Sequence, residues 1–190
     1  MDSIDEMILI GKKLESLGLI ESSHSGNISV RNGNKFLIKK HGKMMGSLNR
    51  DDIIELDFND EKGYEIASSE VYAHRSIYLN TDAKAIIHAH TPYAITLSMF
   101  FEKIFPVDAE GKYYLEYIPV IISEDPVASK DIAEKLGSTL KDHYVAIVRG
   151  HGTFSRGKDL NEALKYLTIC ESVSHLKYLY DLWNSNVHIC

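Results

Sequence analysis

The chain of 190 residues has little of what marks several specialised classes of protein. Its two cysteines, Cys170 and Cys190, fit neither a disulfide framework nor a zinc knuckle, so we expect reduced thiols of a cytoplasmic protein. No apolar run approaches the roughly 20 residues of a membrane helix, and the first residues show no signal-peptide pattern. With 21 basic against 27 acidic residues, the chain also lacks the positive excess of nucleic-acid binders. We therefore expect neither membrane nor nucleic-acid partners.

Internal repeats, low-complexity tracts and linkers are absent as well, and the length suits one domain spanning residues 1–190. The sequence contains no Gly-x-Gly-x-x-Gly or Walker pattern, which argues against a dinucleotide fold or a P-loop. What is present is an alternation of helix and strand patterns.

The first third predicts a helix and three strands. Ser3 and Glu6 form a capping-box pattern, and apolar residues at helical spacing follow until Gly18. Segments 27–31 and 35–40 flank Asn32-Gly33, a strong hairpin signal. A further strand is predicted over 53–58.

Helices alternate with strands in the remainder. We expect helices starting at Glu70, at Pro92, at Asp125-Pro126 and after Asp159, and strands over 84–90, 118–122 and 144–148. Tyr166, Ile169, Val173, Leu176, Tyr180 and Trp183 form an apolar seam on the last helix, expected in the core or a subunit contact. An early hairpin followed by strands separated by helices predicts a mixed sheet with helices on both faces.

Two histidines stand two residues apart at the end of a predicted strand. The period of two places His88 and His90 on the same face, close enough to bind one ion. Imidazole is a good zinc ligand. Alone, such a pair is more often two partly exposed histidines than a metal site.

A third histidine raises those odds. His151 lies in Arg149-Gly-His-Gly152, directly after another predicted core strand. Its flanking glycines permit tight turns and close backbone approach. A lone Gly-His-Gly would be read as a turn, but together with the pair it completes the three protein ligands of a catalytic zinc.

Ser68, Ser69 and Glu70 precede a predicted helix. A carboxylate there can simply stabilise the helix dipole. The same helix start, however, offers backbone N–H groups and two hydroxyls, a combination that binds phosphate. A carboxylate beside an anion pocket, with histidines nearby, suits an acid/base residue. Residues 22–27, centred on Gly26, form a second and weaker candidate anion loop.

In order and spacing, four segments together resemble the class II aldolase/adducin family: Ser25-Gly-Asn-Ile-Ser29, Ser68-Ser-Glu70, His88-Ala-His90 and Gly150-His-Gly152. The resemblance covers nearly the whole chain. It implies a three-layer α/β/α fold around a mixed, largely antiparallel sheet, and a homotetramer with metal sites near subunit interfaces.

The resemblance also assigns residues. It implies one zinc, or another divalent transition metal, bound by Glu70, His88, His90 and His151. It implies a substrate phosphate bound by Gly26, Asn27, His41, Gly42, Ser68 and Ser69. His41 replaces the usual serine or threonine of the family, and His24 stands where a small hydroxyl residue is common.

One catalytic position departs from the family pattern. Aldolases of this family place a tyrosine from a neighbouring subunit near segment 105–112, where this chain has Glu110, followed by Tyr113 and Tyr114. Glu110 is therefore our candidate for the second proton-transfer residue, with Tyr113 as the alternative.

These expectations predict a zinc-dependent aldehyde-lyase acting on a ketose 1-phosphate such as L-fuculose 1-phosphate. The products would be dihydroxyacetone phosphate and a small aldehyde, with Glu70 moving the proton on the dihydroxyacetone phosphate carbon. A sugar-phosphate 4-epimerase or a methylthioribulose-1-phosphate dehydratase would use the same ligands. A noncatalytic adducin-like module need not keep the four ligands, whereas all four are present here. A cupin oxygenase would place a glutamate shortly after His90, and residues 91–95 contain none.

Overall fold

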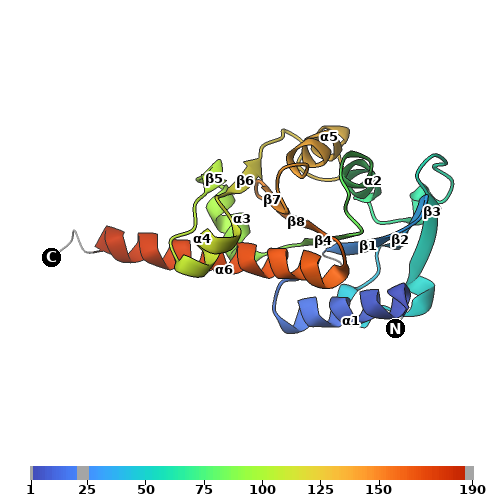
Figure 1. Cartoon of the computed structure of the whole chain (residues 1–190), viewed down its shortest axis with the longest axis horizontal. Helices are drawn as coiled ribbons and strands as arrows, with labels where there is room; N and C mark the ends of the chain where they lie inside the picture. The colour runs from blue at the N-terminus through green and yellow to red at the C-terminus, as the bar shows by residue number, and fades with distance from the viewer. Residues whose placement is uncertain (1, 21–25, 187–190) are drawn as a thin grey trace.

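The central feature of the computed structural model, which describes residues 2–20 and 26–186, is an eight-stranded sheet (Figure 1). Its order is β3-β2-β1-β4-β8-β7-β6-β5. The strands are β1 (Asn27–Asn32), β2 (Lys35–Lys39), β3 (Ile53–Asp57), β4 (Ala85–Ala89), β5 (Lys103–Ile104), β6 (Ile118–Ile121), β7 (Val145–Val148) and β8 (Gly152–Gly157). Only β6 and β7 pair in parallel within the described chain, so the predicted mixed, largely antiparallel sheet is confirmed.

Helices cover both faces of the sheet, as predicted. They are α1 (Ser3–Ser16), α2 (Val71–Asn80), α3 (Pro92–Ser98), α4 (Ala109–Tyr114), α5 (Lys130–Thr139) and α6 (Leu160–Asn186), with short 3-10 turns at Met45–Ser47, Arg50–Asp52 and Tyr64–Ile66. In Figure 1, α2 and α5 lie on one face, whereas α1 and α6 lie on the other. None of the described helices is both long enough and apolar enough to cross a membrane.

Strand β4 is buried on both faces, which explains its continuous apolar sequence. Ile86 packs in the cluster formed with α2 and α5, and Ile87 packs in the cluster formed with α1 and α6. The neighbours of β4 are β1 and β8, both antiparallel to it. The histidines at its end are consequently carried by the middle of the sheet.

Local signals predicted most elements but missed α4, β5 and β8, and two of the predicted helix starts are corrected. The hairpin turns at Gly33, where φ is +60°, and Pro92 begins α3. Helix α1 is capped by Asp2, which accepts a hydrogen bond from the Asp5 backbone, and not by Ser3. The helix predicted at Asp125-Pro126 is wrong, because α5 begins at Lys130.

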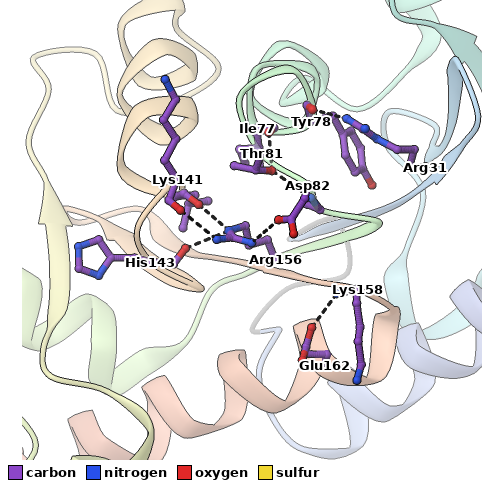
Figure 2. A network of polar contacts seen from close by, with 12 residues as sticks. Arg31, Ile77, Tyr78, Thr81, Asp82, Lys141, His143, Arg156, Lys158 and Glu162 are labelled. Atoms are coloured by element: carbon purple, nitrogen blue, oxygen red, sulfur yellow. Dashed lines mark hydrogen bonds and ion pairs between the residues drawn. The ribbon is translucent and has the colours of Figure 1, made fainter.

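Arg156 on β8 ties three segments together (Figure 2). Its guanidinium donates to the carbonyl oxygens of Leu140, Lys141 and His143 in the connection between α5 and β7, and it pairs with Asp82 at 3.1 Å. Each of the three guanidinium nitrogens thus has an acceptor, in a residue that is 8% exposed. They fix β8, the strand that follows His151.

Candidate metal centre and anion pocket

A cavity of about 280 Å³ brings together almost every predicted site residue. The cavity is lined by Gly26, Asn27, Lys39, His41, Gly42, Ser68, Ser69, Glu70, His88, His90, Val127 and His151. We call His88, His90, His151 and Glu70 the metal wall. We call Gly26, Asn27, Lys39, His41, Gly42, Ser68 and Ser69 the anion wall.

His88 is held rigidly at the end of β4. Its ring is 1% exposed and stacks on Phe154 with centroids 4.0 Å apart. Because the carbonyl of Thr153 can only accept, Nδ1 of His88 must donate the 3.1 Å hydrogen bond between them. The other nitrogen, Nε2, keeps its lone pair for a metal.

The glycines around His151 have the two roles that the sequence suggested. Gly150 turns the chain at φ +68°, and the His151 N–H donates to the Val148 carbonyl at 3.0 Å. A Cβ on Gly152 would lie 2.7 Å from Cε1 of His88. Only glycine therefore lets β8 pass this close to the histidines of β4.

The three histidines form one cluster. Each offers a ligand nitrogen, and these nitrogens lie within 4.8 Å of one another. The ring centroids are 5.1 Å apart for His88–His90, 4.8 Å for His88–His151 and 5.2 Å for His90–His151. Three imidazoles at this spacing match the donor set of a catalytic zinc or a related divalent metal.

Burial keeps the cluster in its ligand form. It lowers the pKa of His88 well below its usual value, and it lowers the pKa of His151 to about 4, with neighbouring histidines adding to both effects. Nδ1 of His151 is buried and has no hydrogen-bond partner within residues 2–20 and 26–186. The neutral rings of His88 and His151 fit the binding of a metal ion.

Glu70 lies next to the histidines at the N-terminal cap of α2. Its carboxylate is 3.7 Å from Nε2 of His151, and its Oε1 accepts a 3.0 Å hydrogen bond from the Ala128 N–H. Burial raises the pKa of Glu70 to about 7, with Asp125 adding to this effect. Because burial disfavours the charged form of both partners, the contact with His151 contributes little as an ion pair near neutral pH. A carboxyl with this pKa can both accept and donate a proton at neutral pH.

The segment that was wrongly predicted as a helix start serves Glu70 instead. Ala128 has a φ of +53°, a left-handed conformation that is strained for a residue other than glycine. This conformation aims its N–H at Glu70, while Ser129 caps α5 by accepting from the Ile132 N–H. The sequence around Ala128 could not predict this contact, because Glu70 lies 58 residues away in the chain.

Gly26 and Asn27 bring the anion wall against the metal wall. Asn27 is paired directly with His88 across β1 and β4. Gly26 has a φ of +77°, and a Cβ there would lie 2.8 Å from the His88 carbonyl oxygen. Residues 22–25, the rest of this predicted loop and the location of His24 and Ser25, lie outside the described residues.

Backbone hydrogen bonds join the two remaining parts of the anion wall. The Ser68 N–H donates to the Lys39 carbonyl at 2.9 Å, and the His41 N–H donates to the Ile66 carbonyl at 3.0 Å. Gly42 turns the chain at φ +69°. Loop 39–42 therefore lies beside the start of α2, with Ser69 and His41 exposed to solvent.

Lys39 is a member of the anion wall that sequence reasoning missed. It is 2% exposed, and its Nζ donates to the Lys43 carbonyl at 2.6 Å. Burial lowers its pKa to about 8, against the opposing charge of Asp52. A bound phosphate would stabilise its cationic form. Lys39 could have been predicted from the period of two, because it lies two residues before His41 and an extended chain turns such residues to the same face.

Glu110 is not brought to the cavity within one chain. It is exposed on α4 and lines a separate depression with Gly111, Thr168 and Val173. Tyr113, the alternative, is 82% exposed.

Comparison with known proteins agrees with this geometry. Residues 5–178 match the family described as Class II Aldolase and Adducin N-terminal domain. The chain belongs to this family.

Several relatives and solved structures in the family are similar to most of the chain. The L-fuculose phosphate aldolase of Methanococcus maripaludis (strain C7) is 30% identical over 155 residues, which cover 81% of this chain and 84% of that protein. The crystal structure of L-fuculose-1-phosphate aldolase from Thermus thermophilus has a TM-score of 0.91 and 32% identity, with 96% of this chain and 95% of that chain covered. The methylthioribulose-1-phosphate dehydratase of Sulfurihydrogenibium sp. (strain YO3AOP1) is 29% identical, covering 86% of this chain and 83% of that protein. This class II aldolase-family chain is accordingly a lyase with a three-layer α/β/α fold.

Proposed function

We propose that the protein reversibly cleaves a ketose 1-phosphate resembling L-fuculose 1-phosphate into dihydroxyacetone phosphate and a small aldehyde. One observation carries the proposal: a single cavity of about 280 Å³ joins a three-histidine cluster, a carboxyl with a pKa of about 7 and an anion pocket. The similarity to L-fuculose phosphate aldolases supports the choice of substrate.

The anion wall supplies the binding energy. Ser68, Ser69 and Asn27 offer neutral donors, and Lys39 offers a buried positive charge. Charge-assisted hydrogen bonds of this kind contribute about 1.5–3 kcal/mol each. They hold the phosphate so that the reacting carbons lie at the metal wall.

The metal wall supplies the chemistry. Glu70, His88, His90 and His151 would hold one zinc per chain, or another divalent transition metal, since imidazole-rich sites do not favour magnesium. When bound, the ion stabilises the negative charge that builds on the substrate oxygen as the bond between C3 and C4 breaks.

Glu70 moves the proton. As the bond breaks, its electron pair stays on C3, and the hydroxyl proton on C4 leaves as the aldehyde forms. Glu70 delivers a proton to C3 in the direction of cleavage and takes one away in the reverse direction. The 3.0 Å hydrogen bond from Ala128 holds its carboxyl at the cavity.

The C4 hydroxyl proton needs a second group. Glu110 stays our candidate and Tyr113 the alternative, and both require a neighbouring subunit because neither lines the cavity of its own chain. A homotetramer, as in the family that the sequence resembles, would supply that neighbour. The exposed Tyr180 and Trp183 on the last turns of α6 are apolar surface available for such a contact.

A second candidate is dehydration of methylthioribulose 1-phosphate. The dehydratase relative has 29% identity over most of both chains, and it would use the same phosphate and metal walls. A noncatalytic adducin-like module is disfavoured because the four predicted ligands come together around one cavity.

The deciding experiment is a cleavage assay across a panel of ketose 1-phosphates with enzymatic detection of dihydroxyacetone phosphate, with and without chelator. We expect chelator-sensitive release that returns when zinc is added. A dehydrated ketone from methylthioribulose 1-phosphate, without carbon–carbon cleavage of any panel member, would replace the proposal by its alternative.

A further inference from the structure

Behind the anion wall, a chain of buried hydrogen bonds runs from the cavity into the core. Asn27, which lines the cavity, contacts Nε2 of His74 through Oδ1. The Ser29 hydroxyl lies 2.6 Å from Nδ1 of His74 and 2.8 Å from the Tyr78 hydroxyl. His74, Ser29 and Tyr78 are almost fully buried. None of these three side chains takes part in the proposed reaction.

His74 is fully buried, and burial favours the neutral form of its imidazole ring. A neutral imidazole carries one proton, so one ring nitrogen donates and the other accepts. The chain of hydrogen bonds therefore has two self-consistent directions. In one, Nε2–H donates to Oδ1 of Asn27. In the other, the Asn27 amide is reversed and donates to Nε2, while Nδ1–H donates to Ser29.

Tyr78 selects between these directions. Among the residues that the structure describes, the Tyr78 hydroxyl has Ser29 as its hydrogen-bond partner. If Nδ1–H of His74 donated to Ser29, the hydroxyls of Ser29 and Tyr78 would have two protons for the one contact between them, so one of these buried protons would have no acceptor among the described residues. Such an unsatisfied donor is costly. With Tyr78 donating to Ser29 and Ser29 donating to Nδ1, every proton in the chain of hydrogen bonds has an acceptor.

The direction decides what Asn27 offers to the cavity. With Oδ1 committed to His74, the NH₂ group remains for an anion; in the reverse direction the cavity would meet a carbonyl oxygen that repels phosphate.

We infer that His74 is a positioning residue, which acts through Asn27 to keep the amide NH₂ group turned towards a bound phosphate. The inference rests on the proposed function for the identity of the anion.

The tautomer of His74 is the direct test. Long-range proton–nitrogen NMR correlation on the zinc-loaded protein should show Nε2–H, and the Asn27 side-chain amide should shift when inorganic phosphate is added. An Nδ1–H tautomer would overturn the inference. This readout does not depend on turnover, so a protein without aldolase activity but with Nε2–H and the Asn27 shift would refute the proposed function and leave the inference standing.

A double-mutant cycle provides the second test, with inorganic phosphate affinity measured by calorimetry. His74→Phe should weaken binding about tenfold, the effect of one lost hydrogen bond to a charged group. His74→Gln, which keeps a donor near the position of Nε2, should recover most of that loss. In an Asn27→Ala background, His74→Phe should have no further effect.

Ser174→Ala is the matched control for lost core polarity, because Ser174 is fully buried and bonds to the Cys170 carbonyl away from the cavity. It should leave phosphate affinity unchanged. Equal effects of His74→Phe with and without Asn27 would show a general structural role and overturn the inference. If His74→Phe does not fold, the NMR measurement of the His74 tautomer and the phosphate affinity of His74→Gln test the inference instead.

Discussion

The two walls of the cavity are built in different ways. Two histidines of the metal wall lie at the end of β4, in the middle of the sheet, and the third lies in the tight turn before β8. The anion wall comes from the ends of β1 and β2, from the loop after β2 and from a helix start, and it includes the exposed His41, Gly42 and Ser69. A metal needs a few ligands at fixed distances, whereas a phosphate accepts many donors in several arrangements. The rigid part of the fold thus carries the part of the site with the strictest geometry.

The largest expected effect follows from breaking the metal wall. His90→Ala should remove the metal and lower turnover by about a thousandfold or more, because the ion stabilises the transition state by several kcal/mol. Elemental analysis of the purified variant checks metal content. His143→Ala, outside the cavity, is the control and should retain both metal and turnover. Unchanged metal content in His90→Ala would contradict the ligand assignment.

Glu70→Gln tests the proton transfer in the same wall. It should lower kcat by about a hundredfold to ten-thousandfold, the usual contribution of an acid/base residue. Inorganic phosphate should still bind, because Glu70 is not part of the anion wall. Glu124→Gln on the exposed segment before α5 is the matched control. Near-normal cleavage by Glu70→Gln would exclude this carboxyl as the proton carrier.

Lys39→Met should affect the other wall, mainly through KM. Loss of a charged partner for the phosphate should raise KM by about tenfold to a hundredfold and change kcat much less. Lys40→Met is the control, because the neighbouring side chain points to the opposite face. Steady-state kinetics with the preferred ketose 1-phosphate measures both. If Lys39→Met lowered kcat as much as Glu70→Gln does, the proposal that the anion wall serves binding and the metal wall serves catalysis would be wrong.

The smallest effect concerns stability in acid. Burial lowers the pKa of His74 from its ordinary value of 6.5 to about 3 in the folded protein, so the unfolded chain binds more protons between these limits. The free energy of unfolding must therefore fall as pH falls through this window. From neutral pH to about pH 5, His74→Gln should lose about 2 kcal/mol less than the wild type. Urea unfolding at both pH values measures it, and equal losses would show that His74 is not buried as described.

Site residues whose positions depend on their sequence neighbours could be predicted, and those whose positions depend on distant parts of the chain could not. His88 and His90 were predictable because a two-residue period is a local property of strands, and His151 because its glycines are adjacent in sequence. Most of the fold was likewise readable from periodicity and turn residues. Lys39 escaped, because its burial depends on Lys43, Asp52 and the start of α2 rather than on its own strand.

Ala128 and the start of α5 show the opposite outcome. Asp125-Pro126 is a good helix start by local rules, yet the chain uses residues 125–129 to reach Glu70 and begins the helix at Lys130. Tertiary contact overrode the local preference. Glu110 stays a prediction, because a partner subunit must bring it to the cavity.

The pairing of Asn27 with His88 fixes the distance between one side chain of the anion wall and one histidine of the metal wall. Both residues belong to adjacent antiparallel strands, so one backbone ladder fixes how far the phosphate donors stand from the histidines. A slip of one residue would turn every side chain of β1 to the opposite face and remove Asn27 from the cavity. In the proposed function, this main-chain pairing would set the distance between the phosphate and the carbonyl of a substrate that fits the cavity.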